Sequence, residues 1–258
     1  PYDFSTPSGV NDHIANLAHQ MKVMGHYVKI IAPISNSSEK DLGEDIVPFG
    51  QPIPVPTGGA IARISFSVWL EPKITAFLRK ENFDIIHLHE PLAPFLPLVI
   101  LRLSNAVNIG TFHAFHGSSK MHWASKYVLE NTANKLDGRI AVSVPAYEFI
   151  NKYLPADYEI IPNGIDTDLF NNAKPFDNLR DEKVNLLFVG RLEKRKGLKY
   201  LLSAYSKIKW DWPNLRLLVI GPGNLDIDSI RIISERNLQD LIFTGSVSDQ
   251  DKARYYKS

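Results

Sequence analysis

Gly190-Arg191-Leu192-Glu193-Lys194-Arg195-Lys196-Gly197 places four basic residues between two glycines. The largely apolar run 184–189 precedes this stretch and predicts a buried strand. Apolar residues at helical spacing follow it, from Leu198 to Tyr205. In an open α/β sheet, ligands bind beyond the carboxyl ends of the strands. A helix start in the same place favours an anion. The stretch therefore predicts a diphosphate site.

Strands and helices alternate through the second half of the chain. The pattern predicts strands at 184–189, 215–220 and 241–244, helices at 198–208 and 226–236, and a last helix from about Asp249. Such alternation is typical of a parallel sheet with right-handed crossovers. Gly190, Gly221 and Gly245 each follow one strand, so three small residues should lie at one edge of the sheet and leave room for a nucleotide.

The first half shows a similar alternation after a turn-rich start. Residues 33–60 are rich in proline, glycine and serine and predict irregular surface structure with one edge strand. The predicted strands of this half are 27–32, 83–89, 108–112 and 139–143. The predicted helices run from Val10 to near Gly25, over 64–80 with a bend at Pro72, and over 121–135 and 146–153. A hairpin-like turn is predicted at Asn163-Gly164, after the segment 159–162.

These patterns predict an α/β protein with two Rossmann-like domains and parallel sheets. The first domain spans residues 1–170, a polar linker follows at 171–182, and the second domain spans residues 183–258 and is incomplete. Because the chain starts at Pro1 without a methionine and ends within a predicted helix, we expect it to be a fragment of a longer protein.

Composition and charge limit the function. The 258 residues are 44% hydrophobic and 22% charged, which is typical of a soluble globular protein. The net charge of +1 gives no bulk attraction for nucleic acid, and the absence of cysteine excludes disulfides and fits a cytoplasmic setting. The longest apolar stretch, 92–101, contains two prolines and is about half as long as a membrane-spanning helix.

Histidines stand at the ends of two predicted strands in the first half. His87 and His89 share one strand face, and His113 ends the next strand. A His-x-His pair is able to ligate a metal, but the sequence offers no convincing set of further ligands, so we favour histidines satisfied by hydrogen bonds. His113 suits a hydrogen bond to a hydroxyl or phosphate group. Glu90 is a further candidate to face a ligand.

Other motifs are weaker or missing. Gly9 opens the first predicted helix, where it either admits a ligand close to the backbone or simply belongs to a helix cap. The sequence has no Walker pattern and no Gly-x-Gly-x-x-Gly after a strand, which disfavours P-loop enzymes and dinucleotide oxidoreductases. It also has no Gly-x-Ser-x-Gly, which argues against an α/β-hydrolase.

The ordered set of motifs resembles one family across nearly the whole chain, the family-four retaining glycosyltransferases of the GT-B fold. The stretches that carry the resemblance are Pro-Ser-Gly-Val-Asn-Asp-His at 7–13, His-Leu-His-Glu-Pro at 87–91, Thr-Phe-His-Ala at 111–114, Ile-Pro-Asn-Gly-Ile-Asp at 161–166, the basic stretch at 190–197 and Gly-Pro-Gly at 221–223. Within the family, the chain is most similar to phosphatidylinositol mannosyltransferases that use GDP-mannose.

The resemblance implies a donor site in the second half. Arg191 and Lys196 match the basic pair that binds the donor diphosphate and stabilises the departing nucleoside diphosphate. Gly221 and Gly245 would lie near the nucleotide. Lys194 and Arg195 would then face solvent or the acceptor rather than the phosphates.

The resemblance also implies roles in the first half. Gly9 matches the loop glycine that approaches donor phosphate and acceptor, and His113 matches the histidine beside the transferred sugar. Tyr2 and Asn11 match acceptor-side residues. The family transfers the sugar by front-face attack, with the leaving phosphate helping to deprotonate the acceptor. No enzyme nucleophile, cofactor or essential metal is then required, and magnesium is optional.

Three departures qualify the resemblance. Ser8 stands where many members have a second glycine, and the helix carrying Lys73, Arg79 and Lys80 has fewer basic residues than lipid-acceptor members show. The family's carboxyl-terminal Glu-x7-Glu segment is absent from the chain, so we expect this chain alone to be inactive.

Two questions stay open at this point. The first concerns the aromatic and basic residues of the predicted helix 64–80, which include Phe66, Trp69 and Phe77. They either form an interfacial helix at the cytoplasmic face of a membrane, or the aromatic side chains pack on the first sheet. Three alternatives to a GDP-mannose-dependent enzyme remain. They are an enzyme that uses a UDP-sugar and a soluble acceptor, a bilobal module that binds sugar or nucleotide without catalysing a reaction, and a related sugar phosphorylase.

Overall fold

A strand buried on both faces organises the second half of the chain. β10 (Leu215–Ile220) is buried along its whole length and lies between β9 (Val184–Val189) and β11 (Leu241–Gly245) in a parallel sheet of three described strands. Its residues are nearly all aliphatic, as expected of a central parallel strand. The bounds of β9 and β10 match the predicted ones, and the prediction of a parallel sheet is confirmed.

In this computed structural model the chain divides into two compact units, Pro1–Ile165 and Asp166–Ser258. The structure describes residues 3–6, 8–35, 43–50, 52–57, 60–65, 70–113 and 130–258. Each unit is described by itself.

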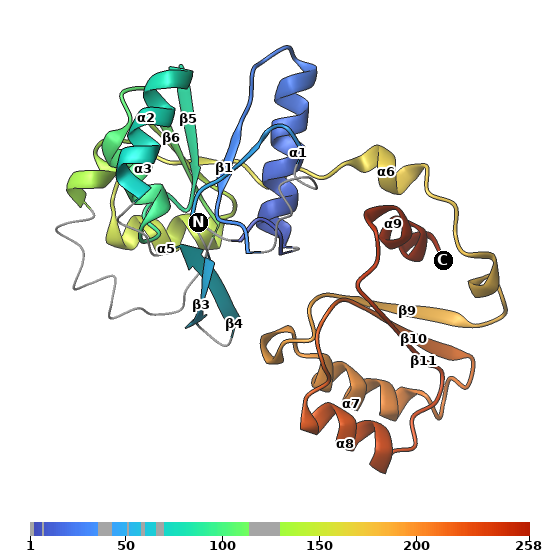
Figure 1. Ribbon diagram of the computed structural model, residues 1–258. Helices are drawn as coiled ribbons and strands as arrows, with labels where there is room; N and C mark the ends of the chain where they lie inside the picture. The colour runs from blue at the N-terminus through green and yellow to red at the C-terminus, as the bar shows by residue number, and fades with distance from the viewer. Residues whose placement is uncertain are drawn as a thin grey trace. The chain divides into compact units, whose positions relative to one another are not determined.

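Helices cover both faces of the second unit's sheet (Figure 1). α7 (Leu198–Ile208) and α8 (Ile227–Glu235) lie side by side on one face, and α9 (Asp249–Lys257) lies on the other. Leu198, Leu202 and Tyr205 of α7 pack on Leu217 and Val219 of β10. The Tyr205 hydroxyl also donates to the Leu215 carbonyl at 3.0 Å, so α7 is fixed in one register on β10.

The predicted linker 171–182 packs against the second unit. α6 (Thr167–Asn171) contacts α9, and the short 3₁₀ helix η2 (Asp177–Leu179) buries Leu179. The Phe176 amide donates to Ser258 Oγ at 2.9 Å. Arg216, which interrupts the apolar β10, donates to both carboxylate oxygens of Asp181 at 2.9 and 3.0 Å. The polar residues of this segment are therefore partners of the sheet.

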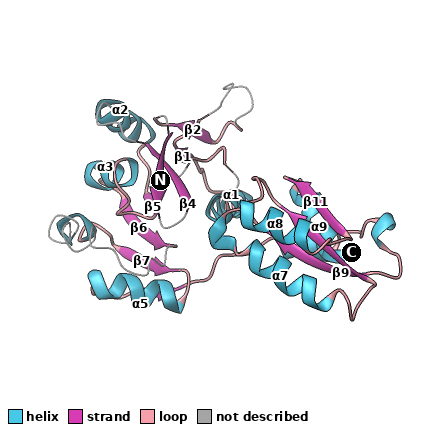
Figure 2. Ribbon diagram, turned by 90° about the horizontal axis from the view of Figure 1, so that it is seen from below, coloured by secondary structure: helices cyan, strands magenta, loops and turns pink. Residues whose placement is uncertain are grey.

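The first unit is built on a parallel sheet of four described strands. These are β5 (Ile85–His89), β6 (Val107–Phe112), β7 (Gly138–Ala141) and β8 (Glu159–Ile160), in that order. α3 (Leu96–Leu103) packs on β5, and α5 (Val144–Tyr153) packs on β6 and β7. Figure 2 shows the strands running side by side between helices. Buried Leu88, Leu101 and Phe112 lie in the core of this unit.

The remaining elements of the first unit precede β5. α1 (Gly9–Val23) is followed by the parallel pair β1 (Ile30–Ala32) and β2 (Ile46–Pro48), by the antiparallel hairpin β3 (Pro52–Thr57) and β4 (Ala60–Ser65), and by α2 (Glu71–Glu81). Of the predicted helix 121–135, only residues 130–135 are described, and 130–133 are helical. Among the described residues, no helix is long and apolar enough to cross a membrane.

Four local predictions were wrong. Residues 64 and 65 end the strand β4 rather than begin a helix, and residues 33–60 contain more strand than one edge strand. Prolines at 52, 54 and 56 hid this hairpin, but alternate spacing puts their missing N–H groups on one side of β3, away from β4. Pro72 lies in the first turn of α2, where proline is tolerated, so it does not bend the helix.

The fourth error is the hairpin-like turn at Asn163-Gly164. β8 pairs in parallel with β7, so the chain does not reverse after it, and residues 161–166 run without regular structure to α6. Asp166 caps α6 by accepting a hydrogen bond from the Leu169 amide at 3.1 Å. The Asn-Gly pair therefore lies in a connection that leads to a helix.

Candidate functional site

Three loops at the carboxyl edge of the second unit's sheet are joined by backbone hydrogen bonds. The Gly190 amide donates to the Ile220 carbonyl, and the Gly221 amide donates to the Gly245 carbonyl, each at 2.9 Å. The Leu192 amide donates to the Pro222 carbonyl at 2.9 Å. The predicted edge of three glycines is therefore present, and it is a connected backbone surface.

Gly221 has a packing reason of its own. Its φ of +142° is open to glycine, and a Cβ atom placed there would lie 2.0 Å from the Gly190 carbonyl oxygen. Gly245 also has a positive φ, of +70°, but a Cβ atom there would meet nothing within 4 Å. Gly221 thus lets two loops meet, whereas Gly245 leaves open space. Contact of either glycine with a nucleotide stays a prediction.

The basic residues of the Gly190 loop differ in their surroundings. Arg191 Nε lies 3.2 Å from Glu193 Oε1, and Arg195 Nε lies 3.0 Å from Glu193 Oε2, so one carboxylate holds two guanidinium groups. The aliphatic part of Lys196 runs beside Gly190. Lys194, Arg195 and Lys196 are all exposed, so exposure does not separate Lys196 from the other two, and their different roles stay a prediction. Arg191 and Lys196 both belong to the loop that directly follows β9.

The loop leaves β9 and enters α7 through a short intermediate turn. Lys194–Lys196 form the 3₁₀ helix η3, and Gly197, with φ of +73°, is the cap residue that precedes α7. The Lys196 amide donates to the Glu193 carbonyl at 2.8 Å, which holds this turn closed. The position where strand meets helix was predicted correctly, while the intervening turn was not foreseen.

In the first unit the structure brings histidines together at the ends of β5 and β6. The rings of His87 and His89 stack with centroids 4.5 Å apart, as expected for one strand face. His89 Nδ1 and His113 Nε2 lie 2.9 Å apart, within hydrogen-bond distance. His87 Nε2 likewise lies 2.7 Å from Thr111 Oγ1. His13 of α1 completes the group, with its ring centroid 5.6 Å from those of both His89 and His113.

Burial keeps these histidines neutral. Desolvation lowers the pKa of His87 and of His113 to about 4 and that of His89 to about 2, and neighbouring imidazoles add to the effect. Burial also lowers the pKa of His13. Near pH 7 each ring therefore carries a lone pair. His113 Nδ1 is buried and has no hydrogen-bond partner among the described residues.

Glu90 fixes the backbone beside these rings. Its carboxylate accepts a hydrogen bond from the His113 amide at 2.7 Å, and its own amide donates to the Thr111 carbonyl at 2.7 Å. Glu90 adopts φ of +56°, which is uncommon for a residue with a side chain. The structure therefore shows Glu90 joining the ends of β5 and β6. Whether it also faces a ligand stays a prediction.

The sequence argument missed His13. It found no convincing ligands beyond the His87–His89 pair, and the structure places His13 and His113 beside His89. Metal binding by these residues is not tested by this arrangement. His13 is one turn after Gly9 on α1, so the helical period places both on one side of the helix. That spacing was the available signal, although it does not say which strand end the helix start approaches.

The amino-terminal candidates lie around the start of α1. Ser8 caps the helix by accepting from the Asn11 amide at 3.2 Å, and Gly9, its first residue, has open space where a Cβ atom would lie. The Asn11 side-chain amide donates to the carbonyls of Asp3 and Thr6 at 2.9 and 2.8 Å. Asn11 thus holds the preceding loop, and its acceptor-side role stays a prediction. Tyr2 lies outside the described residues.

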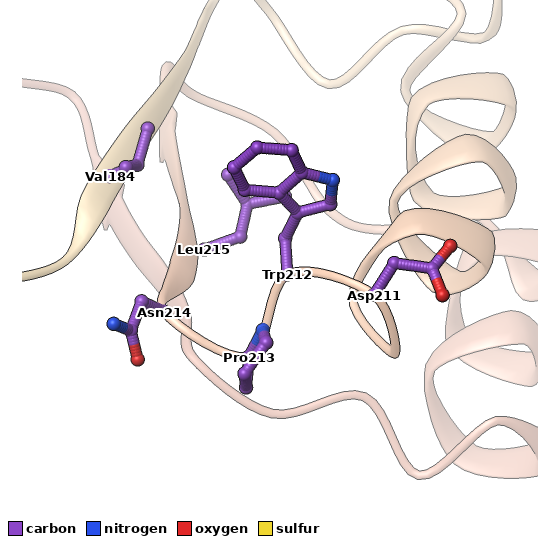
Figure 3. Close-up of a pocket in the computed structure, with 6 residues that line it drawn as sticks. All are labelled: Val184, Asp211, Trp212, Pro213, Asn214 and Leu215. Atoms are coloured by element: carbon purple, nitrogen blue, oxygen red, sulfur yellow. The ribbon is translucent and has the colours of Figure 1, made fainter.

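A pocket in the second unit lies away from the predicted site. It is lined by Asp211, Trp212, Pro213 and Asn214 together with Val184 and Leu215, which begin β9 and β10 (Figure 3). Its cavity volume of about 120 Å³ is smaller than that of ordinary ligand pockets. Because Val184 and Leu215 stand at the amino ends of their strands, this pocket lies at the opposite end of the sheet from Arg191.

Comparison with known proteins identifies the family. Residues 7–169 match the family model described as Glycosyltransferase Family 4, and residues 170–258 match that of Glycosyl transferases group 1. The chain belongs to glycosyltransferase family 4. It is 35% identical, over its full length, to a phosphatidyl-myo-inositol mannosyltransferase of Mycobacterium tuberculosis, of which it covers 68%. The assignment to the family-four glycosyltransferases, inferred from the motifs, is therefore confirmed.

Solved structures support the fold. A glycosyltransferase from Rickettsia africae matches 94% of the chain with a TM-score of 0.66 and 17% identity, and the chain covers 66% of it. Anabaena HepE in complex with UDP-glucose matches 72% of the chain with a TM-score of 0.56 and 20% identity, and the chain covers 54% of it. The family-four chain thus has the predicted GT-B architecture of α/β units with parallel sheets.

Proposed function

We propose that this protein is a retaining glycosyltransferase that moves mannose from GDP-mannose to a hydroxyl of a lipid acceptor such as phosphatidylinositol. The observation that carries the proposal is the pair Arg191 and Lys196 beyond the carboxyl end of β9, in a chain 35% identical to a named phosphatidyl-myo-inositol mannosyltransferase. Ligands of open α/β sheets bind at this edge.

The chemistry of the pair suits a diphosphate. A guanidinium group forms two parallel hydrogen bonds to phosphate oxygens, and an ammonium group adds a point charge. Arg191 already lies against a carboxylate, that of Glu193, at 3.2 Å. In the proposed complex a phosphate takes up further guanidinium donors while Glu193 limits where Arg191 can move. Negative charge that builds on the leaving diphosphate is then stabilised by groups already in place.

The proposed transfer needs no enzyme nucleophile. The acceptor oxygen forms a bond to the anomeric carbon on the face from which the diphosphate departs, and the acceptor proton passes to a phosphate oxygen of the leaving group. His113 takes the role of a neutral hydrogen-bonding group beside the sugar. Burial, which lowers the pKa of His113 to about 4, supports the neutral form. Gly9, with open space in place of a side chain, is proposed to admit donor and acceptor close to the backbone.

Membrane contact through residues 64–80 stays a prediction. Phe77 is partly buried and packs against the core of the first unit, with its ring centroid 5.5 Å from that of Phe49, which supports the packing alternative for this residue. Lys73, Arg79 and Lys80 are exposed on α2. Phe66 and Trp69 lie outside the described residues, so they give no information on this point.

Nucleotide binding separates the proposal from its alternatives. In calorimetry on the purified chain, we expect GDP to bind and Arg191→Ala to weaken binding by about 1.5–3 kcal/mol, roughly tenfold to hundredfold, because a charged hydrogen-bonding group is removed. Arg195→Ala, which removes an exposed cation from the same loop, is the matched control and should leave binding nearly unchanged.

Three results would contradict the proposal or part of it. Preference for UDP over GDP would show that the donor is a UDP-sugar rather than GDP-mannose. Binding of free sugar without nucleotide would favour a bilobal module that binds sugar and catalyses no reaction. Equal losses in Arg191→Ala and Arg195→Ala would show that the loop acts only through its total charge.

A further inference from the structure

Three histidines from separate elements converge in the first unit. His13 comes from α1, His89 from the last position of β5, and His113 from directly after β6. One ring nitrogen from each lies within 4.8 Å of the others. The three residues are far apart in the sequence, so only the fold brings them together. We call this group the histidine triad.

One distance within the triad, that between His89 and His113, is close to the distance between two ligands of a metal site. Zinc binds histidine nitrogen at about 2.0–2.1 Å, so two nitrogens of a tetrahedral site lie roughly 3.3 Å apart. His89 Nδ1 and His113 Nε2 are already 2.9 Å apart, a little closer than that value. The ring of His13, which is half-buried on α1, has the larger adjustment to make.

The scaffold holds two of the ligands firmly. β5 and β6 pair in register, with His89 opposite Thr111, and the His113 amide is fixed by the Glu90 carboxylate. A site whose ligands are positioned by neighbouring strands binds a metal with little loss of side-chain freedom. His87, stacked on His89 and within hydrogen-bond distance of Thr111 Oγ1, further restricts the His89 ring.

The protonation state also fits. Metal ligation requires a neutral imidazole, and burial lowers the pKa of each member of the triad. In His113 the nitrogen that faces His89 is Nε2, and Nδ1, which has no partner among the described residues, is the other nitrogen of that ring. Imidazole nitrogens suit zinc, cobalt, nickel and copper, whereas magnesium and calcium prefer oxygen ligands.

We propose that His13, His89 and His113 form a binding site for one divalent transition-metal ion, with Zn²⁺ as the best-fitting occupant. Three histidines leave a fourth tetrahedral position for water or another ligand. On the basis of the proposed function, in which His113 contacts the transferred sugar, a bound Zn²⁺ holds the His113 ring away from the sugar and inhibits transfer.

Metal binding to the whole chain tests the proposal. After treatment with a chelator, titration with Zn²⁺ in a calorimeter should show one ion bound per chain. Co²⁺ should give the visible absorption of a tetrahedral nitrogen site. His13→Ala should weaken Zn²⁺ binding tenfold or more, because one of three ligands is lost. His19→Ala, an exposed histidine further along α1, is the matched control and should bind as the unchanged chain does.

The variants are chosen so that a loss of Zn²⁺ binding does not come from misfolding. His13 is half-buried, so His13→Ala should keep the far-ultraviolet circular dichroism spectrum of the unchanged chain. His113→Gln, which keeps a hydrogen-bonding side chain, provides a second loss of ligand. Absence of Zn²⁺ binding, or Zn²⁺ binding that persists in both variants, would overturn the site.

The same samples separate this proposal from the proposed function. GDP binding is measured alongside, with and without Zn²⁺. Zn²⁺ binding without GDP binding would support the histidine triad and count against the glycosyltransferase proposal. GDP binding without Zn²⁺ binding would support the glycosyltransferase proposal and contradict the histidine triad as a metal site.

Discussion

At Gly221 a missing side chain lets two loops pack against each other. The Gly190 carbonyl oxygen occupies the space that a Cβ atom would need, only 2.0 Å away. The backbone there has φ of +142°, which residues with side chains rarely adopt. Gly221 thus supports the loop that carries Arg191, whether or not a nucleotide also contacts it.

Gly221→Ala should destabilise the second unit severely. We expect a loss of about 4 kcal/mol or more in the free energy of unfolding, because steric overlap adds to backbone strain. Gly245→Ala is the control, since its Cβ atom meets nothing within 4 Å and only the positive φ is unfavourable. The free energy of unfolding of Gly245→Ala should fall by about 1 kcal/mol. Chemical denaturation monitored by circular dichroism measures both, and equal losses would refute the packing explanation.

Asp240 joins three elements of the second unit. It precedes β11, and its carboxylate forms ion pairs with Lys183, just before β9, and with Lys209, at the end of α7. The Lys209 contact measures 2.7 Å. Hydrogen bonds from Lys183 and Lys209 lower the pKa of the Asp240 carboxyl. The ends of strand, helix and strand are therefore linked through one charged group.

The lowered pKa of Asp240 predicts a pH-dependent stability. The carboxylate form is favoured in the folded state, so its contribution is full above the unfolded-state pKa of about 3.9 and disappears as the pH falls through the lower folded-state value. Asp240→Asn should lower the free energy of unfolding by about 1 kcal/mol at pH 7. Asparagine tolerates the φ of +56° at this position, so the backbone should not change.

Denaturation curves of both proteins across the acidic range test this prediction. The difference between the unchanged chain and Asp240→Asn should shrink as the pH falls below about 3.9. A difference that stays constant with pH would show that shape, and not charge, accounts for the loss.

Across the whole chain, the division between the two compact units falls after Ile165, so residues 171–182 belong to the second unit. Residues 171–182 are held by the Phe176–Ser258 hydrogen bond and by the ion pair between Asp181 and buried Arg216. Residues 161–166 have no regular structure, and Ile165 is 70% exposed. Backbone that is exposed and outside regular structure is the preferred place for proteolytic cleavage.

Limited proteolysis tests this assignment. Within residues 159–182, we expect thermolysin to cut first at 162–166, most readily before the exposed Ile165. Mass spectrometry of the fragments locates the cut. In the matched variant Asp181→Ala, which removes the Arg216 partner, cleavage should extend into 171–182. First cleavage of the unchanged chain within 171–182 would contradict the packing described for that segment.

The sequence by itself determined the elements whose burial follows a local period. β9, β10 and α7 have their predicted bounds because apolar residues repeat at strand or helix spacing, and the glycines after the strands gave the edge at which Arg191 and Lys196 lie. The ordered motifs were also enough to assign the family, as its model matches over residues 7–169 show.

Only the tertiary structure decided which distant residues meet. His13 and His113 lie beside His89, Asp181 pairs with Arg216, and residues 60–65 pair with a proline-rich strand. A local pattern reports how one segment is buried, but a contact between segments depends on how helices pack on a sheet and on which strands are neighbours. That information is held by the whole set of packing interactions, so neither the histidine triad nor the packed segment at 171–182 was visible in the sequence.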